Sequence, residues 1–455
     1  MKKVSDYRNK NVLVLGLGKS GVSAAKLLIR LGANVTVNDR QTPKDLKEVA
    51  ALERAGAKVI TGSHPLSLLD KADLMVKNPG IPYNNPLVAA AVKRAIPVIT
   101  EPELGYVVSE APFISVTGTN GKTTTTTLIT KMLDESLIGH AYSVGNIGVP
   151  VTQVAPQVTS DDYLVTELSS FQLMGIQQLH PHIAVITNIY TAHTDYHGSR
   201  ENYVQAKMRI MMNQTQDDYL VINWDNPEWQ EISAHTKAQV VPFSRENRIQ
   251  TGTYEQNGDL YFRGERIMAA SEIKVPGSHN VENALAAIAV AKLMNVDNSV
   301  IKHILTTFNG VRHRTQYVTT INDRIFYNDS KATNIEATLK ALAGFKDHVV
   351  LLAGGLDRGF TFERLAPAMH NKVDTLIVFG ETADLIATAG KQAQVPQIIH
   401  VNDAVAAVPV AYEHSQPGST ILLSPACASW DQWPTFEVRG DKYIEAIEQL
   451  KNEVV

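Results

Sequence analysis

The sequence has little of what marks a secreted, membrane or nucleic-acid-binding protein. Its single cysteine, Cys427, excludes an internal disulfide, and no apolar run approaches the roughly 20 residues that span a bilayer. No apolar stretch follows the start MKKVSDYRNK, as a signal peptide requires. Neither sign of charge dominates, because 42 basic residues against 46 acidic residues leave a formal net charge of −4. We therefore expect a cytoplasmic protein without membrane insertion or a nucleic-acid partner. We also expect a monomer, although composition and charge do not determine the oligomeric state.

The pattern that is present is an alternation of short β-branched runs with amphipathic helical segments, almost from end to end. Such alternation is typical of α/β proteins with parallel sheets. Proline and glycine punctuation divides the chain into blocks at 1–102, 103–310 and 311–455. We predict three α/β domains, with hairpin strands near 251–268 in the second. The alternative is one large sheet of which the blocks are sub-regions.

A glycine motif in the first block indicates a diphosphate site. Gly16, Gly18 and Gly21 form G-x-G-x-x-G between a predicted strand and a predicted helix, and Asp39 ends the next strand. The glycines allow a tight turn and close backbone approach, and the helix N-terminus offers free N–H groups to a diphosphate. The pattern fits NAD, and it fits a UDP diphosphate for the same physical reasons. It also fits a turn that only packs helix on strand.

A second loop, TGTNGKTT, lies between the strand FISVT and a helix, where a phosphate-binding loop belongs. Position 116 is Val116, so the usual G-x-x-x-x-G-K-[ST] spacing fails. The compact form still offers backbone N–H groups to wrap phosphate oxygens, Lys122 to neutralise the terminal phosphates, and Thr123 to hold Mg²⁺. We predict that this loop binds ATP.

Five segments of the second and third blocks, in the order TGTNGKTTT, ELSSFQL, ITNI, GSHNVENALAA and DSKATN, resemble those of the Mur ligase family, and the similarity as a whole covers all three blocks. The segments GLGKSG, KNPGIP and LSPACASWDQW are similar to the D-glutamate-adding branch of that family. The resemblance implies a Rossmann-like first domain, a central P-loop ATPase-like domain and a Rossmann-like third domain.

The resemblance also implies an activity. The chain would be an ATP-dependent acid–D-amino-acid ligase that adds D-glutamate to UDP-N-acetylmuramoyl-L-alanine during peptidoglycan precursor synthesis. The reaction would pass through an acyl phosphate, which replaces a very poor leaving group by phosphate. Because acyl phosphates hydrolyse readily, and because the implied ATP contacts lie on two blocks, we expect the third domain to move during the cycle.

Catalytic and metal-binding roles come from the resemblance at five positions. Thr123 and Glu167 would hold one Mg²⁺ beside the terminal phosphates of ATP, and His193 would help to hold a second one near the substrate carboxylate. Lys207 matches a position where these ligases carry a lysine carbamylated by carbon dioxide. An ammonium cannot ligate Mg²⁺, whereas a carbamate offers two anionic oxygens. Lys122 completes the catalytic set. Without the resemblance, Lys207 would be interpreted as a solvated helix charge.

Three sets of ligand contacts are implied in the same way. For ATP they are Gly118, Thr119, Asn120, Gly121, Lys122, Thr123, Thr124, Asn280, Asn283, Arg314, Asp329 and Lys331. For the UDP-linked substrate they are Gly18, Ser20, Gly21, Asp39, Arg40, Gly80, Asn146 and His193. For D-glutamate they are Lys331, Thr333, Arg358, Ser429 and Phe436. By itself, Asn280 would suggest a helix cap.

Other functions stay open at this point. Another Mur ligase or a folylpolyglutamate synthase would share the phosphate loop and the GSHN helix, and the first block and the LSPACASWDQW loop discriminate against both. A nicotinamide-dependent oxidoreductase would explain the first glycine motif but leaves Lys122 and Lys207 without a role. A nucleotide-dependent switch would explain the phosphate loop without bond-forming chemistry.

Overall fold

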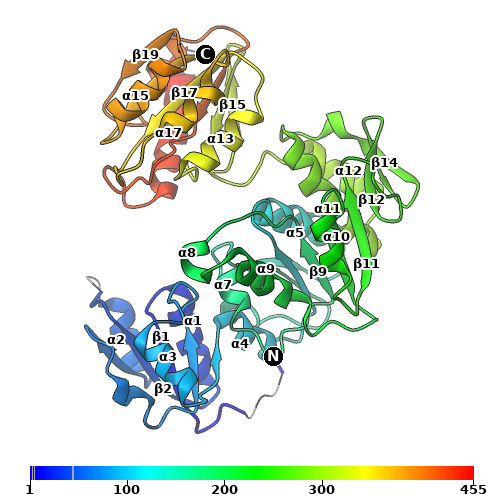
Figure 1. Cartoon of the computed structure of the whole chain (residues 1–455), viewed down its shortest axis with the longest axis vertical. Coiled ribbons are helices and arrows are strands. Elements are labelled where there is room, and N and C mark those ends of the chain that lie inside the picture. The colour runs from blue at the N-terminus through cyan, green and yellow to red at the C-terminus, as the bar shows by residue number, and fades with distance from the viewer. Residues whose placement is uncertain (3, 5, 44–45, 137, 455) are drawn as a thin grey trace. The chain divides into compact units, whose positions relative to one another are not determined.

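The computed structural model describes residues 1–455 except 3, 5, 44–45, 137 and 455. Within that part of the chain the strands form three separate sheets of five, nine and six strands, which Figure 1 shows along its colour gradient. The predicted α/β class with three sheet-containing domains is confirmed, and the alternative of one large sheet is wrong. Backbone contacts group the residues into two compact units, 1–272 with 281–305, and 273–280 with 306–455.

The first sheet is parallel and has the strand order β3-β2-β1-β4-β5. Its elements are β1 (Asn11–Leu15), α1 (Lys19–Arg30), β2 (Asn34–Asp39), α2 (Lys47–Arg54), β3 (Lys58–Thr61), β4 (Leu74–Lys77), α3 (Pro86–Lys93), β5 (Val98–Ile99) and α4 (Glu101–Val108). The strand order reverses between β1 and β4. Ligands of open parallel sheets bind at such a switch point, outside the carboxyl ends of the strands.

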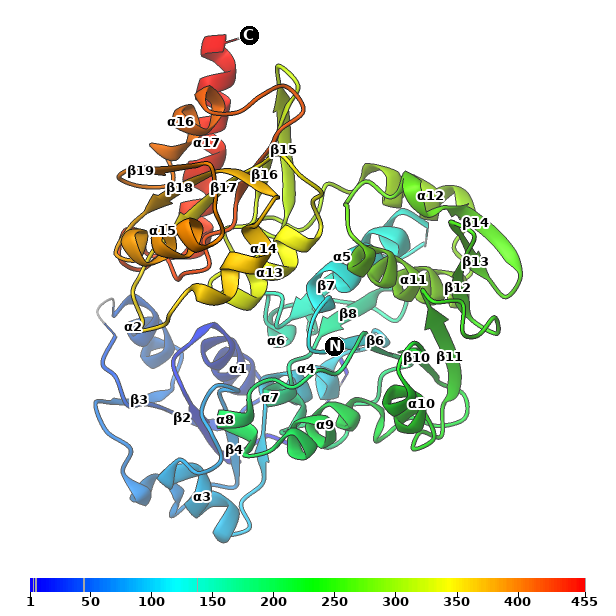
Figure 2. The same ribbon diagram turned by 45° about the horizontal axis from the view of Figure 1, so that its top comes forward.

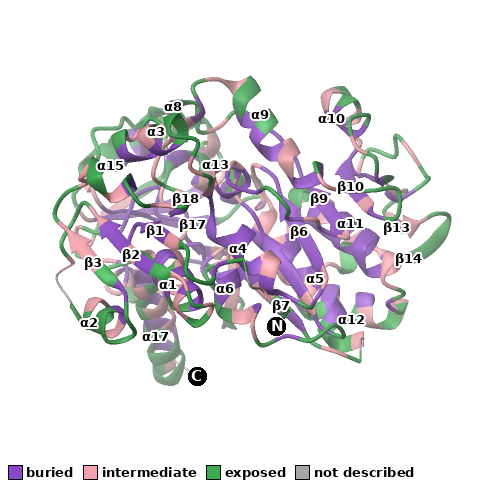
Figure 3. Cartoon of the chain, turned by 90° about the horizontal axis from the view of Figure 1, so that it is seen from below, coloured by how far each residue is buried: buried purple, intermediate pink, exposed green. Residues whose placement is uncertain are grey.

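The second sheet has the order β14-β13-β12-β11-β10-β9-β6-β8-β7. Its strands are β6 (Phe113–Thr117), β7 (Ala141–Gly145), β8 (Tyr163–Glu167), β9 (Ile183–Ile186), β10 (Tyr219–Asn223), β11 (Gln239–Ser244), β12 (Thr253–Gln256), β13 (Asp259–Phe262) and β14 (Glu265–Ala269). Strands β6 and β9 are buried along their whole length, as their colour in Figure 3 shows, because helices cover both faces. The antiparallel strands β12, β13 and β14 confirm the predicted hairpins.

The helices of the middle part of the chain lie between these strands, except α11 and α12, which follow β14. They are α5 (Lys122–Ser136), α6 (Val151–Val154), α7 (Ser170–Leu173), α8 (Thr194–His197), α9 (Arg200–Met208), α10 (Pro227–Ser233), α11 (Ser278–Leu293) and α12 (Asn298–Thr307). Helix α5 begins directly after the TGTNG loop, so its N-terminal N–H groups face the place where that loop turns. The predicted order of strand, phosphate loop and helix is therefore confirmed.

The third sheet has the order β15-β16-β20-β17-β18-β19, and only β15 is antiparallel to its neighbour. Its elements are β15 (Gln316–Ile321), β16 (Arg324–Asn328), α13 (Ile335–Ala343), β17 (Val349–Gly354), α14 (Ala366–Met369), β18 (Val373–Phe379), α15 (Ala383–Gln392), β19 (Gln397–His400), α16 (Ala407–Glu413), β20 (Thr420–Leu423) and α17 (Phe436–Val454). Figure 2 shows α17 as the long red helix beside this sheet. Adjacent parallel strands β16, β20 and β17 bring the loops that follow them to one edge.

Candidate active site

The glycine motif forms the tight turn that its spacing predicts. Gly16 has a φ of +108°, and a methyl group on Gly21 would overlap the carbonyl of Gly16. Asp39 fastens this turn from β2, since one carboxylate oxygen accepts from the Leu17 amide at 2.8 Å and the other from the Gln41 amide at 2.9 Å. Asp39 thus stabilises the turn. A direct contact between Asp39 and a ligand stays a prediction.

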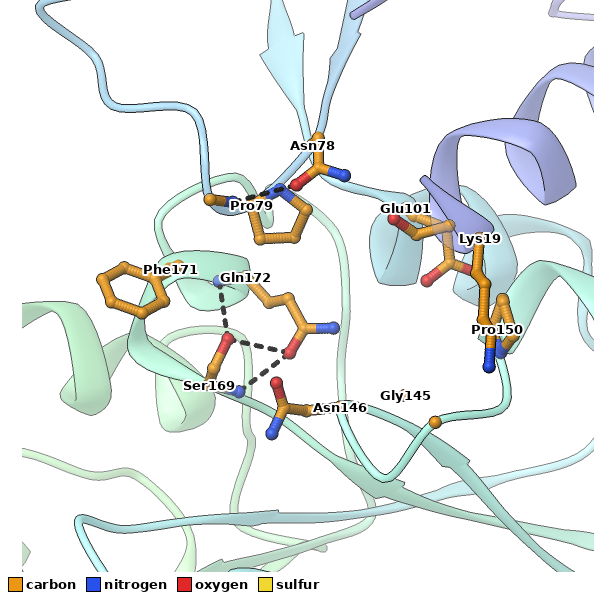
Figure 4. A pocket seen from close by; sticks show the side chains of 13 residues that line it. Lys19, Asn78, Pro79, Glu101, Gly145, Asn146, Pro150, Ser169, Phe171 and Gln172 are labelled. Carbon is orange, nitrogen blue, oxygen red and sulfur yellow. Dashed lines mark hydrogen bonds between the residues drawn. The ribbon is translucent and has the colours of Figure 1, made fainter. Parts of the chain in front are cut away.

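A cavity of about 330 Å³ opens beside the switch point of the first sheet. It is lined by Lys19, Ser20, Asn78, Pro79, Gly80, Glu101, Gly145, Asn146, Gly148, Pro150, Ser169, Phe171 and Gln172. Figure 4 shows Lys19 and Glu101 on one side of it and Phe171 on the other. Five separate segments of the sequence therefore form one pocket.

Three of the positions predicted for the UDP-linked substrate, Ser20, Gly80 and Asn146, line this cavity. The other predicted positions, Gly18, Gly21, Asp39, Arg40 and His193, are not among its lining residues. Sequence reasoning missed Lys19, which lies inside the quoted GLGKSG segment, and Asn78, which directly follows β4. A rule that examines every residue after the central strands of a parallel sheet would have found both.

Polar side chains hold the far wall of the cavity in place. Ser169 and Gln172 form a capping box at the start of α7, and Figure 4 marks these bonds as dashed lines. Asn146 donates from Nδ2 to the Glu167 Oε1 atom at 2.6 Å. Because Glu167 ends β8, this bond connects the cavity to the edge of the second sheet that carries the phosphate loop.

Glu101 is a buried carboxyl in the cavity wall. It is 2% exposed, and its Oε1 accepts from the Thr152 amide at 2.5 Å and from the Thr152 hydroxyl at 2.7 Å. Burial raises the pKa of Glu101 from 4.5 to about 7, against the opposing effect of these two bonds. The group is thus largely protonated in weakly acidic solution and charged in weakly basic solution.

Replacing Glu101 by glutamine is expected to flatten the pH dependence of stability. Between about pH 4.5 and pH 7 the folded protein retains a proton that the unfolded chain has lost, so stability falls as pH rises through this window. Glutamine keeps the acceptor for Thr152 and has no charge to bury. Thermal unfolding measured at about pH 5 and about pH 8 should show a smaller loss for Glu101→Gln than for the wild type. Equal losses would contradict the raised pKa.

The phosphate loop takes its shape from the strand next to it. The Thr119 and Asn120 amides donate to the backbone carbonyl and side-chain oxygen of Asn188, both at 2.9 Å. The Thr187 hydroxyl donates to the Asn120 carbonyl at 2.6 Å. Gly118 has a φ of +152°, and a methyl group there would overlap Thr187. Thr187 and Asn188, from the ITNI segment, are therefore residues that position the loop.

Lys122 is the first residue of α5, and its Nζ donates to the Gly118 carbonyl at 2.9 Å and the Thr119 carbonyl at 3.0 Å. The ammonium therefore lies over the loop that it follows in sequence. The next residue, Thr123, is 6% exposed. Loop, cation and helix N-terminus together form the arrangement that phosphate groups require.

Glu167 and Lys207 are both 1% exposed and lie at the same edge of the second sheet. Within the described part of the chain, the Glu167 Oε2 atom is buried without a hydrogen-bond partner. The Lys207 Nζ donates to the Gly118 carbonyl at 2.7 Å. Burial, followed by the positive charge of Lys122, holds the Lys207 pKa well below 10.5, and Glu167 opposes this shift. The expectation of a solvated Lys207 is therefore wrong, because α9 places it inside the protein.

A divalent cation fits these residues. An unpaired buried carboxylate oxygen is costly unless a cation compensates it, and Glu167 offers such an oxygen at the sheet edge that carries the phosphate loop. Among the described residues, no group of three or more His, Cys, Asp and Glu side chains could hold a metal. A complete Mg²⁺ site here thus needs hydroxyl, water or phosphate oxygens as well, which suits Mg²⁺.

His193 is exposed and has a φ of +54°, directly before α8. Its ring lies 5.0 Å from that of Phe171, measured between centroids, and Phe171 lines the cavity. His193 is therefore near the cavity without belonging to its wall. The ring centroid of Tyr203 lies 6.2 Å from that of His193, and the Tyr203 hydroxyl is 3.0 Å from the Thr119 hydroxyl.

Asn280 and Asn283 both lie in the first two turns of α11. Because this helix begins at Ser278, Asn280 lies inside it rather than at the cap position, and its Nδ2 donates to the Pro276 carbonyl at 2.7 Å. The cap interpretation is therefore wrong. The Asn283 Oδ1 accepts from the Thr125 hydroxyl at 3.3 Å and packs so close to Gly121 that a methyl group there would overlap it. Asn283 thus borders the phosphate loop.

In the third sheet, Asp329 follows β16 and is 7% exposed. Its carboxylate accepts from the Ser424 hydroxyl at 2.8 Å and the Thr315 amide at 3.0 Å. Burial raises the Asp329 pKa to about 7, and the hydrogen bonds and the neighbouring Arg314 act against this effect. Asp329, Arg314 and the loop after β20 are therefore held together within this unit.

The residues predicted for D-glutamate lie in loops after β16, β17 and β20, except Phe436, which is the first residue of α17. Lys331 Nζ is 4.9 Å from the Phe436 ring centroid, and the Arg358 guanidinium is 4.9 Å from that of Trp430. Ser429 is 1% exposed, and its Oγ has no hydrogen-bond partner among the described residues. Thr333 follows Lys331 in the same loop. The two cations Lys331 and Arg358 and the unsatisfied hydroxyl of Ser429 at one sheet edge suit an anionic ligand.

Comparison with known proteins gives matches along the whole chain. Residues 10–100 match the N-terminal domain of MurD-like Mur ligases, residues 116–291 match the Mur ligase middle domain, and residues 313–427 match the Mur ligase glutamate ligase domain. A protein of Ligilactobacillus salivarius named UDP-N-acetylmuramoylalanine–D-glutamate ligase is 66% identical, over 100% of this chain and 99% of its own length. The chain belongs to the Mur ligase family. The enzyme class expected from the sequence is thereby confirmed.

Other relatives of this Mur ligase carry the same name. The protein of Lactiplantibacillus plantarum is 61% identical over 99% of this chain and 98% of its own length, and that of Listeria innocua is 57% identical over 100% of both. Among solved structures, the UDP-N-acetylmuramate-alanine ligase MurC of Thermotoga maritima aligns with a TM-score of 0.59 at 19% identity, over 97% of this chain and 100% of that one. This likeness supports the fold. Among the described residues, no helix of this Mur ligase is long and apolar enough to cross a membrane.

Proposed function

We propose that this Mur ligase joins D-glutamate to UDP-N-acetylmuramoyl-L-alanine at the expense of ATP, in the cytoplasm, as a step of peptidoglycan precursor synthesis. The observation that carries the proposal is full-length identity of 56–66% to relatives named for this reaction. We also propose domain boundaries after residues 102 and 310, which the extents of the three matched family domains support. The competing oxidoreductase gains no support from these relatives.

The first part of the proposal is activation of a carboxylate, because oxide is too poor a leaving group for an amine to displace. An oxygen of the L-alanine carboxylate attacks the γ-phosphorus of ATP, the bond to the ADP oxygen breaks, and an acyl phosphate forms. Lys122 offsets the negative charge of the transferring group, and the loop N–H groups hold it in line. In the second part, the D-glutamate nitrogen attacks the acyl carbon, phosphate leaves with the bonding electrons, and the amine loses a proton.

Magnesium ions fit this chemistry, because Mg²⁺ neutralises charge on a transferring phosphoryl group and polarises the oxygen of a tetrahedral intermediate. Thr123 and Glu167 would hold one ion. His193 and Lys207 would hold the other, provided that Lys207 carries a carbamate. The unpaired Glu167 oxygen supports the first assignment.

Carbamylation of Lys207 needs an uncharged amine, and the lowered pKa of this buried lysine favours that form. The nitrogen lone pair attacks the carbon of carbon dioxide, an N–C bond forms, and one proton leaves. The product replaces a cation by an anion with two oxygens. The carbamate would then relieve the repulsion between Lys207 and Lys122 and provide a ligand for Mg²⁺.

The UDP-linked substrate would occupy the 330 Å³ cavity, with Lys19 and the start of α1 near its diphosphate. D-glutamate would bind at the edge of the third sheet, where Lys331, Arg358 and Ser429 offer two cations and a donor. Two carboxylates need such a set, since their desolvation is otherwise uncompensated.

A phosphate-release assay with UDP-N-acetylmuramoyl-L-alanine and a panel of amino acids tests the proposed function. D-glutamate should support turnover, whereas D-alanine and L-lysine should react roughly 10⁴-fold more slowly, because they leave the polar groups of the pocket unpaired. L-glutamate is the matched control for chirality. Equal turnover with D-alanine or L-lysine would place the chain in another branch of the family, and phosphate release without the muramyl substrate would indicate a nucleotide switch.

A further inference from the structure

Lys77, the last residue of β4, is a buried cation that the proposed reaction does not use. It is 1% exposed, and its Nζ donates to the carbonyls of Ile81 at 2.8 Å, Pro79 at 3.2 Å and Asn78 at 3.3 Å. Its hydrogen-bond partners in the described part of the chain are these carbonyls and one phenol, with no carboxylate among them. A buried ammonium without an anion is costly to maintain.

The carbonyls that Lys77 binds belong to the loop that forms one wall of the substrate cavity. Asn78, Pro79 and Gly80 line that cavity, while Lys77 lies behind them in the protein. The Asn78 Oδ1 accepts from the Gly80 amide at 3.0 Å. Asn78 also packs against Gly16, where an added methyl group would meet its Cβ at 2.7 Å. The loop is therefore fastened both to the glycine turn and to Lys77.

Tyr196 of α8 joins the same cluster from the second sheet's side of the cavity. Its hydroxyl lies 3.3 Å from the Lys77 Nζ, 3.0 Å from the Pro79 carbonyl and 3.1 Å from the Ile81 carbonyl. The phenol can thus accept from the ammonium while it donates to a carbonyl. Tyr196 follows His193 by three residues in the sequence.

Phe171 connects Tyr196 to His193 and to the cavity wall. Its ring centroid lies 4.4 Å from that of Tyr196 and 5.0 Å from that of His193, and its side chain forms part of the cavity wall. Any displacement of the loop that Lys77 holds would therefore be transmitted to the segment that carries His193. The charge of Lys77 also acts on the cavity through a low-dielectric interior, where screening is weak.

We propose that Lys77 is a positioning residue for the UDP-linked substrate: it holds the loop Asn78–Ile81 in its binding shape and, through Tyr196, fixes that loop against the His193 segment. Its positive charge favours the diphosphate of the substrate, although Lys77 does not touch it. The identity of the substrate in this proposal rests on the proposed function. The contacts that hold the loop are observed in the structure and are independent of that function.

Binding of UDP-N-acetylmuramoyl-L-alanine and of UDP alone, measured by calorimetry without ATP, tests this role. Lys77→Met keeps the length of the side chain and removes its donors and charge, so both ligands should bind at least about 10-fold more weakly. Tyr196→Phe should weaken the binding of the muramyl substrate by about 3-fold or more, because the substitution removes one hydroxyl and keeps the packing of the ring. The KM for ATP should stay within about 2-fold of the wild type, since the phosphate loop is unaffected. Lys93→Met, at the exposed end of α3, is the matched control.

A proton-linkage measurement separates this role from a purely structural one. Burial lowers the Lys77 pKa from 10.5 to about 8, while the facing phenols Tyr83 and Tyr196 have a pKa raised by burial. Both phenols therefore stay neutral near pH 8. Lys77 titrates in this range, and so does Glu101 in the cavity wall, whose pKa is about 7, so the difference between the wild type and Lys77→Met reports on Lys77. Binding of a diphosphate at about pH 8.5 should take up part of a proton in the wild type and less in Lys77→Met. Calorimetry in buffers of different ionisation enthalpy measures this uptake.

The outcomes distinguish the two proposals. If the wild type binds the muramyl substrate and both variants bind it equally well, the role of Lys77 is overturned and the proposed function stands. An equal rise in the KM for ATP and for the muramyl substrate would also overturn the role, because it indicates general damage. Wild-type protein that binds neither ligand would overturn both proposals. If Lys77→Met does not fold, Tyr196→Phe alone decides the question.

Discussion

Replacing Lys122 by alanine is expected to lower kcat by about 10³-fold or more while the protein stays folded. The ammonium hydrogen-bonds carbonyls of the phosphate loop and lies where the terminal phosphates of ATP would bind. Its charge offsets the negative charge that spreads over the transferring phosphoryl group, and such contributions are among the largest in phosphoryl transfer. Phosphate release under saturating substrates measures the effect.

Lys131→Ala is the matched control for this variant, because the residue is an exposed lysine of the same helix α5. The control should turn over at the wild-type rate, since surface substitutions change stability by roughly 0.5 kcal/mol or less. Circular dichroism of both variants checks that the helix is intact. Near-normal turnover of Lys122→Ala would remove the phosphate loop from the proposed mechanism.

Replacing Lys207 by alanine is expected to have an effect of similar size, about 10³-fold on kcat. The substitution removes the nitrogen that would carry the carbamate and therefore one ligand of the second Mg²⁺. Removing carbon dioxide and bicarbonate from the wild-type enzyme should lower its activity in the same direction, and adding bicarbonate should restore it. The variant should show no response to bicarbonate.

A carbon-13 NMR signal gives a readout of this modification apart from activity. Wild-type protein in labelled bicarbonate should show a carbamate resonance that Lys207→Ala lacks. Lys237→Ala, which changes an exposed lysine, should retain both the resonance and the turnover. Unchanged turnover of Lys207→Ala would contradict the assigned role, whatever the spectrum shows.

Local features of this protein could be predicted from its sequence alone. The α/β class follows from hydrophobic periodicity, and the two loops that bind phosphate groups in related folds follow from glycine spacing next to a strand. These signals are local because a tight turn or a helix start depends on a few neighbouring residues. Gly16, Gly21 and Lys122 therefore lie where their motifs predict. The family resemblance supplied the roles of Glu167, His193 and Lys207, which no local pattern indicates.

Contacts between distant segments could not be predicted from the sequence, because they depend on the tertiary structure. The cavity is built from Lys19, Asn78, Glu101, Asn146 and residues 169–172, because the order of parallel strands brings several strand ends to one edge. The burial of individual charged side chains also results from the way in which distant segments pack together. A sequence pattern predicts that a lysine or a glutamate is solvated. Packing removes water from Lys207 and Glu101, and this burial lowers the pKa of Lys207 and raises the pKa of Glu101. Long-range packing sets that desolvation, so the sequence pattern around these residues does not contain it.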